Sequence, residues 1–223
     1  MGDALFLQLR ADLAQALLPE EFHEAQGRAL DVFDLLSADF VAQSAVDLAC
    51  RDGCSLCCSL RVDVFAHEVW QIARHVLDHF TPGALDELHA RLKKHAGQVL
   101  AIDAFTHATQ NMVCPLLQSG SCSVYAVRPQ ACRRHHSTDF AACQFTYDHP
   151  TDLDFPGAHH RPLFLVLSEA LQSSGQVYAD GGYDSTVYEL GTALEEALND
   201  PAAWVRWQGK RPAFLASSVT PTS

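Results

Sequence analysis

The chain has 223 residues, and 48% of them are hydrophobic, which is enough for one good-sized core. Its formal net charge is −12, and its 15 basic residues are scattered singly or in pairs, so the sequence lacks the basic stripe that neutralises nucleic-acid phosphates. Its apolar stretches are too short to span a membrane, and its first ten residues lack the basic start of a secretory signal. We therefore expect one cytoplasmic domain that binds neither nucleic acid nor membrane.

Two helices are predicted before the first cysteine. The first carries apolar residues from Leu5 to Leu17 on one face and is stopped by Pro19. The second has apolar residues at every third or fourth position from Phe22 to Phe40. Its pattern fades towards Cys50, so we expect this helix to deliver the first thiol.

In the middle of the chain, the spacing of the apolar residues changes several times. Residues 60–64 alternate apolar and polar side chains, which predicts a short strand with one wet face. A helix is then expected from about Ala66 to Phe80, and another, capped by Thr81, is expected to reach about Thr106. Two apolar segments around the turn at residues 118–121 predict a β-hairpin.

The last third carries fewer chemical signals. An apolar run at residues 163–171 predicts a buried helix that ends before Ser173. A further helix is expected over about residues 184–198. Trp204 and Trp207 are three residues apart, a spacing more typical of core than of a recognition surface.

These elements predict a mainly α fold with a small β-hairpin, in a single helical domain built around a Cys-rich metal site. Its parts are an N-terminal helical region (residues 1–49), a cysteine-cluster metal-binding region (50–143), a C-terminal helical region of the same domain (144–216) and a disordered tail (217–223).

Clustered cysteines dominate the chemistry of the chain. Seven of its eight cysteines are candidate metal ligands: Cys50, Cys54, Cys57, Cys58, Cys114, Cys122 and Cys132. The Cys54–Cys57 step has the C-x2-C spacing with which one turn of backbone delivers two sulfurs to one metal. Gly53 and Gly120, which precede cysteines, can supply the positive φ angles that turn backbone N–H groups toward sulfur.

Two alternatives to a metal site are a disulfide framework and unrelated buried thiols. An even number of cysteines permits disulfides, but such frameworks belong to small secreted domains that cannot build a core. This chain has enough apolar residues for a core and no recognisable signal, so the spacing favours metal.

The identity of the metal stays open between zinc or iron ions and an iron-sulfur cluster. Zinc takes four ligands, so this many thiols would serve two zinc ions or one with bystanders, whereas one [4Fe–4S] cluster takes four thiolates. Adjacent Cys57 and Cys58 are expected to point in different directions, so both bind only if they serve different metals or one bonds another group. The sequence slightly favours the cluster.

Several polar residues are expected near the cysteines, although none is assigned a catalytic role. Arg128 and Arg133 can offset the negative charge of the thiolates. His135 and His136 are the best candidates for a non-cysteine ligand or proton carrier, with ordinary loop residues as the alternative. Glu68, at an expected helix start, is either a helix cap or a pocket residue. The histidines expected on helices, mostly at the surface, are His67, His75, His79, His89 and His95.

These motifs resemble the bacterial YkgJ-like cysteine-cluster proteins, described as a zinc- or iron-chelating domain with a CxxCxxCC signature. The matching pieces, in the family's order, are Gly53–Cys58, Val62–Glu68, Cys114–Leu117 and Cys122–Arg133. The chain departs from the pattern in the three-residue gap between Cys50 and Cys54, where the family has two. Cys143 lies outside the matched pattern.

The resemblance implies metal chelation by the cysteines. A related pattern occurs in flagellin lysine N-methylases, where an iron-sulfur cluster is associated with it. The alternatives are therefore a cluster-dependent enzyme that modifies a protein partner or substrate, with a pocket lined by His135, His136 and Glu68, and a carrier of exchangeable metal.

Overall fold

The computed structural model describes residues 7–8, 10–12, 19–51, 53–155 and 157–220. Most of the helix expected over residues 5–17 and the last three residues of the expected tail lie outside this part of the chain.

The described chain is mostly helical, with two small antiparallel sheets, which confirms the expected fold class. The helices are α2 (Pro19–Ser44), α3 (Ala66–His79), α4 (Pro82–Val99), α5 (Ala104–Ala108), α6 (Gln130–Arg134), α7 (Phe140–Asp148), α8 (Arg161–Asp180), α9 (Leu190–Asn199) and α10 (Pro201–Gln208), with 3-10 turns η1 (Leu56–Ser59) and η2 (Tyr125–Val127). The strands are β1 (Asp63–Phe65), β2 (Leu117–Gln118), β3 (Ser121–Cys122) and β4 (Val187–Glu189).

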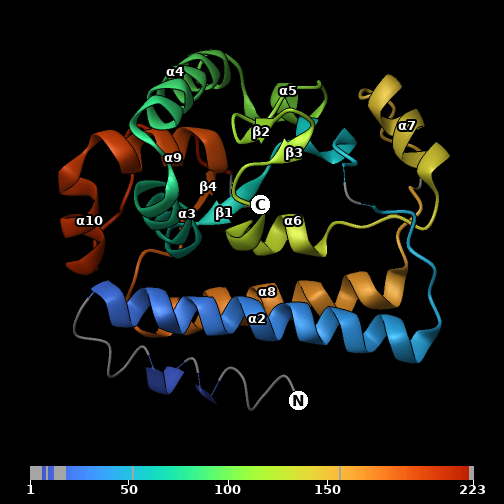
Figure 1. Cartoon of the computed structure of the whole chain (residues 1–223), viewed down its shortest axis with the longest axis horizontal. Helices are drawn as coiled ribbons and strands as arrows, with labels where there is room; N and C mark the ends of the chain where they lie inside the picture. The colour runs from blue at the N-terminus through green and yellow to red at the C-terminus, as the bar shows by residue number, and fades with distance from the viewer. Residues whose placement is uncertain (1–6, 9, 13–18, 52, 156, 221–223) are drawn as a thin grey trace.

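The long helices α2 and α8 pack against each other along one edge of the molecule (Figure 1). Helices α3, α4, α9 and α10 are grouped at one end, and α7 lies at the other end. The short helix α6, which carries Cys132, lies between the long pair and the β2–β3 hairpin, which carries Cys122.

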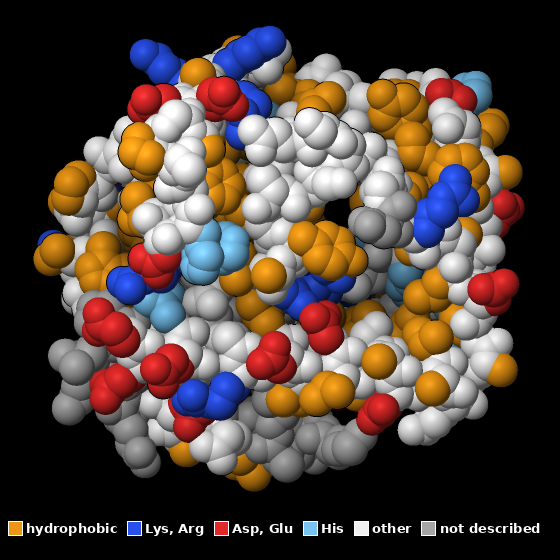
Figure 2. All heavy atoms as spheres, in the orientation of Figure 1, with side chains coloured by type: hydrophobic (Ala, Val, Ile, Leu, Met, Phe, Trp, Pro, Cys, Tyr) orange, Lys and Arg blue, Asp and Glu red, His pale blue; other side chains and the backbone are white. Residues whose placement is uncertain are grey.

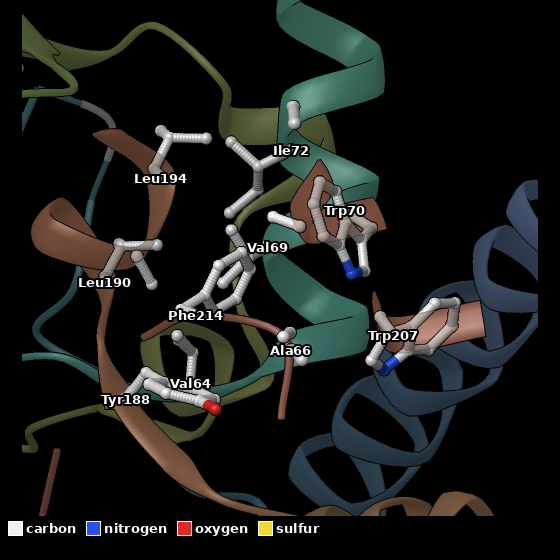
Figure 3. Packing of buried hydrophobic residues seen from close by; sticks show 14 of the residues in the cluster. Val64, Ala66, Val69, Trp70, Ile72, Tyr188, Leu190, Leu194, Trp207 and Phe214 are labelled. Carbon is white, nitrogen blue, oxygen red and sulfur yellow. The ribbon is translucent and has the colours of Figure 1, made fainter. Parts of the chain in front are cut away.

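The main core surrounds α3. Its residues Val69, Ile72 and Val76 follow helical spacing and are fully buried. They share one apolar cluster with Leu92 of α4 and Leu194 of α9, and Figure 3 shows α3 side chains facing those of α9 and the segment after α10. The four helices therefore bury a continuous core without any contribution from metal.

Aromatic residues of α10 complete this core. Trp207 is buried and Trp204 is partly buried, and the two rings lie 5.2 Å apart between centroids. Trp70 of α3 lies against both of them, and Figure 3 shows Trp70 and Trp207 at the same side of the cluster. The expected core role of the tryptophan pair is confirmed for Trp207, although no helix was predicted around it.

A second apolar cluster holds α2 to α8. Phe33 of α2 packs with Leu163, Leu167 and Ala170 of α8, all of them buried. This cluster anchors the N-terminal helix and explains its long amphipathic pattern.

The β1–β4 pair joins segments that are far apart in sequence. Asp63 lies opposite Glu189 and Phe65 opposite Val187 in an antiparallel register. Helix α3 follows β1 directly and α9 follows β4 directly, so the pair places the starts of the two main core helices next to each other. No second sheet was expected from the sequence.

The described end of the chain, through Thr220, lies along β4. The Thr220 N–H donates to Val187 O at 2.9 Å, and Val219 forms a bridge with Tyr188. Free backbone groups along β4 give the tail these partners, which its local composition does not reveal.

Two helices differ from their predicted bounds in the first half of the chain. Helix α2 ends at Ser44 before Ala45, which has a φ of 51°, so Cys50 lies on a segment after the helix and not on it. Helix α4 ends at Val99 instead of Thr106. A separate helix α5 starts after Asp103, whose side chain accepts the Thr106 N–H at 2.6 Å.

Two more helices differ in the second half. Helix α8 continues past Ser173 to Asp180, so the expected end before Ser173 is wrong. Helix α9 begins at Leu190 with Glu189 as its cap, because the residues before it form β4. Helix α7 was not predicted at all.

No helix in the described residues is long and apolar enough to cross a membrane. On the face shown in Figure 2, Lys and Arg side chains lie in separate spots, interspersed with Asp and Glu.

Candidate metal centre

The first cysteine segment is a tight turn anchored at its start. The Ala49 N–H donates to Ser137 O at 2.8 Å, which fixes the chain just before Cys50. Gly53 has a φ of +78°, as expected, and the turn then passes into η1. The Cys58 N–H donates to Ser55 O at 3.0 Å, so the backbone of the C-x2-C motif forms a turn.

The second cysteine segment is hydrogen-bonded directly to the first. The Cys114 N–H donates to Cys58 O at 2.7 Å, and the Met112 N–H donates to Ser59 O at 3.0 Å. Helices α3, α4 and α5 lie between these segments in the sequence. The chain therefore leaves the first cysteine segment, forms these helices and returns to the same segment.

The predicted hairpin is confirmed and places a further thiol. Leu117 pairs with Cys122 across β2 and β3. Ser119 and Gly120 at the turn have φ angles of 50° and +80°, which match the two positive φ values of a type I′ hairpin turn. Because the Leu117 N–H also donates to Cys114 O at 3.0 Å, Cys114 and Cys122 belong to one compact unit.

The buried carboxylate of Glu68 places helix α6. Its Oε2 accepts the Phe65 N–H at 3.0 Å and its Oε1 accepts the Gln130 N–H at 2.8 Å. Burial raises the pKa of Glu68. Both oxygens are thus used to tie the start of α3 to the start of α6, which carries Cys132. This arrangement favours the capping interpretation over a pocket role.

Four thiols converge around Cys132. Burial raises the pKa of Cys132 well above its ordinary value, and nearby charge on Cys114, Cys57 and Cys122 raises this pKa further. The same burial raises the pKa of Cys114 to about 12, and Cys122 adds to that rise. The sulfurs of Cys57, Cys114 and Cys122 therefore lie within electrostatic range of Cys132.

Cys50, Cys54 and Cys143 form a second group of neighbouring thiols, which shares Cys57 with the group around Cys132. Burial raises the pKa of Cys50, and charges on Cys143, Cys57 and Cys54 add to the rise. Cys143 lies on α7, which packs against η1. Spacing in the sequence gave no sign of this position, because Cys143 reaches the site through a helix that was not predicted.

The eight cysteines are all free thiols, so the disulfide alternative has no counterpart in the structure. A hydrogen bond between the side chains of Cys57 and Cys58, together with burial, raises the pKa of Cys57. The two thiols therefore interact with each other.

The two arginines have different surroundings. The Arg128 guanidinium lies 3.8 Å from the centroid of the Tyr125 ring. Burial raises the pKa of Cys122, and the charge of Arg128 opposes this rise. Arg133 instead donates to Arg128 O at 2.9 Å and to Ala126 O at 2.6 Å, and it pairs with Asp34. Its contacts anchor the loop to α2 rather than offset thiolate charge.

The two histidines after Cys132 also differ. His136 is buried, its Nδ1 lies 2.8 Å from Arg134 O, and its Nε2 accepts the His160 N–H at 3.1 Å. Both ring nitrogens of His136 therefore have hydrogen-bond partners. Burial lowers the pKa of His135 to about 4, and His159 lowers it further, so the His135 ring is neutral near pH 7.

A small cavity adjoins the thiols. Its volume is about 70 Å³, and its chemically active lining consists of Cys57, Cys143, His135, His136 and His159. The expected pocket histidines are therefore present in the lining, while Glu68 is not part of it.

The donor set fits a thiophilic metal. The cysteines are free thiols, backbone hydrogen bonds join the segments of Cys58, Cys114 and Cys122, and the Glu68 carboxylate holds the start of α6. Even so, among the described residues no three cysteine sulfurs lie within 4.8 Å of one another.

A second group of side chains that could hold a metal ion contains no cysteine. Donor atoms of His95, His107 and Glu189 all lie within 4.8 Å of one another, and all three residues are buried. His67 is buried as well, so His67 and His95 are exceptions to the mostly exposed histidines expected on helices. Only the three-dimensional fold reveals this group, because its members come from three separate elements.

No curated protein and no solved structure matches this chain. Residues 49–151 match a family model described as "CxxCxxCC: Putative zinc- or iron-chelating domain". That stretch contains all eight cysteines. This part of the chain is therefore similar to the CxxCxxCC family of zinc- or iron-chelating domains.

Proposed function

We propose that the protein holds a [4Fe–4S] cluster through Cys57, Cys114, Cys122 and Cys132. The observation that carries the proposal is the spacing of the sulfurs. They gather around Cys132 within electrostatic range, yet no three cysteine sulfurs of the described residues lie within 4.8 Å of one another.

A single zinc ion requires closer sulfurs than these. Tetrahedral zinc holds each sulfur at about 2.3 Å, which places the four sulfurs about 3.8 Å from one another. In a [4Fe–4S] cluster each thiolate binds a different iron, so the sulfurs surround a larger body. A cluster is therefore compatible with sulfurs that lie farther apart than one zinc ion allows.

The electrostatics of the thiols support a bound cationic centre. Burial raises the pKa of Cys114 and of Cys132, so without metal both thiols keep their protons near pH 7. Iron stabilises the thiolate forms and releases these protons. When bound, such a cluster supplies one-electron transfer. The chain itself buries two of the ligands, Cys114 and Cys132, and Glu68 positions the helix α6 that carries Cys132.

A second candidate is a cluster-dependent protein-modifying enzyme, and the cavity beside Cys57 favours it. The cavity has room for the end of a side chain or a few waters rather than a whole nucleotide. Burial lowers the pKa of both His135 and His159, so each ring is neutral near pH 7 and can accept a proton from a group placed there. A metal carrier is less well supported, because rapid exchange requires thiols more exposed than Cys114 and Cys132.

Metal analysis of protein purified without oxygen and without a metal-binding tag tests the proposal. We expect iron with sulfide and a broad visible absorption that dithionite bleaches. Cys132→Ser should lose both, whereas Cys143→Ser, a matched control outside the four proposed ligands, should keep both. Colourless wild-type protein containing zinc would contradict the cluster, and equal loss in Cys143→Ser would show that the second group of neighbouring thiols holds the metal.

A further inference from the structure

We infer that His95, His107 and Glu189 form a second metal site, free of cysteine, that binds a zinc-like divalent cation. This site shares no residue with the proposed cluster, although the charge of Glu189 contributes to raising the pKa of Cys114.

The three donors converge from three elements. His95 lies near the end of α4, His107 lies in α5, and Glu189 ends β4. His95 Nε2 is 3.0 Å from Glu189 Oε1, and the two imidazole rings are 5.9 Å apart between centroids. Two imidazoles and one carboxylate form a donor set that zinc uses with one position left for water or substrate.

All three side chains are removed from solvent. His95 is 6% exposed, His107 1% and Glu189 3%. Burying a carboxylate and two imidazoles together is costly unless charges are compensated, and a divalent cation compensates the carboxylate more fully than one shared proton does.

The backbone around the group is shaped to hold it. Glu189 accepts the Gly191 N–H at 2.9 Å and the Thr192 N–H at 2.7 Å, which fixes its carboxylate at the start of α9. A Cβ atom at Gly191 would lie 2.7 Å from His95 Nε2. The absence of a side chain at Gly191 is therefore what admits the imidazole to this position.

The neighbouring charges are compatible with a cation. Arg61 Nη1 lies 3.2 Å from His107 Nδ1, but its Nε pairs with Asp63 at 2.8 Å, so the guanidinium charge is already balanced. Arg61 also donates to Thr220 Oγ1 at 3.1 Å and can give up one contact while it keeps the others. Cation binding replaces the proton shared by His95 and Glu189, and that proton is released to solvent.

Zinc titration of the folded full-length chain, with X-ray absorption at the zinc edge, tests this inference. We expect one zinc ion with nitrogen and oxygen ligands, in addition to the metal held by sulfur. His95→Gln and Glu189→Gln should weaken it by a factor on the order of 100 or more. His89→Gln, on the same helix but outside the site, should leave it unchanged. The sulfur-bound metal is counted separately in every variant, so failure of the proposed cluster does not affect the result.

Equal zinc affinity in the wild type and both site variants, or wild-type protein without nitrogen- and oxygen-bound zinc, would overturn the inference. If the variants do not fold, wild-type protein labelled with ¹⁵N-histidine provides the test. Zinc must then shift the ring nitrogens of two histidines, and unchanged ring signals would likewise overturn it.

Discussion

The helical group around α3 and the cysteine segments are stabilised in different ways. In the helical group, fully buried residues such as Ile72, Leu92 and Leu194 pack in one continuous cluster. The cysteine segments consist of a 3-10 turn, a hairpin with two residues in each strand, and the five-residue helix α6. Elements this short do not bury enough apolar area to be stable alone.

This difference indicates which part of the molecule depends on metal. Burial and mutual repulsion raise the pKa of the Cys132 thiol, and the cysteine segments meet through a few backbone hydrogen bonds and the Glu68 carboxylate. Metal binding therefore contributes to the stability of the cysteine segments, while the core keeps its own stability.

Removal of the metal should have the largest and most local effect. In Cys132→Ser, or after anaerobic chelation, we expect amide hydrogen exchange to accelerate strongly in residues 50–60 and 112–135, while α3, α4 and α9 stay protected. Hydrogen-exchange mass spectrometry measures this directly. A uniform loss of protection over the whole chain would mean that the two regions are not independent.

A cavity in the helical core should, in contrast to metal removal, destabilise the core and leave the metal in place. Leu92→Ala should lower the free energy of unfolding by about 2–5 kcal/mol because Leu92 is fully buried. Metal content per folded molecule should not change. Leu100→Ala, at an exposed residue after the same helix, should cost less than about 0.5 kcal/mol in the same urea titration. A loss of metal in folded Leu92→Ala would contradict the separation of the regions.

Gly175 tests how the β1–α3 junction packs on α8. An added Cβ would lie 2.6 Å from the Phe65 ring, so Gly175→Ala should destabilise the protein by about 1–3 kcal/mol although alanine favours helix. Gly97→Ala in α4, where a Cβ meets no atom within 4 Å, should instead stabilise by up to about 1 kcal/mol. Thermal or urea unfolding compares the two, and equal effects would show that the Phe65 contact has no energetic weight.

A pH dependence also originates in the core. His67 stacks on Tyr178, with 3.8 Å between ring centroids, and burial lowers the pKa of His67 to about 3. The unfolded chain binds this proton below about pH 6.5, so the free energy of unfolding falls as the pH drops from there toward 3. His67 contributes at most about 1.4 kcal/mol per pH unit in this window.

Replacing His67 with phenylalanine isolates this contribution. His67→Phe keeps an aromatic ring in the stack and should flatten the pH dependence by that amount in urea titrations. Parallel curves for the wild type and the variant would show that His67 does not keep its low pKa.

Local pattern was sufficient for the elements that depend on local interactions. The apolar spacing in α3, the Thr81 cap of α4 and the turn at Gly120 all predicted what the structure has. The cysteine spacing also predicted the similarity of residues 49–151 to the CxxCxxCC family model.

Elements that depend on distant partners could not be predicted in this way. Helix α8 continues through Gly175 because that glycine packs against Phe65, a contact between residues far apart in the chain. The β1–β4 pair is likewise long-range. The same holds for the approach of His95 to Glu189, because no local signal links a helix end to a strand end.

The position of α9 late in the chain has a consequence for biosynthesis. This helix packs on both α3 and α4, so the core remains incomplete until Asn199 has left the ribosome. The last of the four proposed ligands, Cys132, emerges well before that point. During translation the thiols are therefore exposed to oxidants and stray metals before the core can shelter them, and the cell must keep the nascent chain reduced until its final third is made.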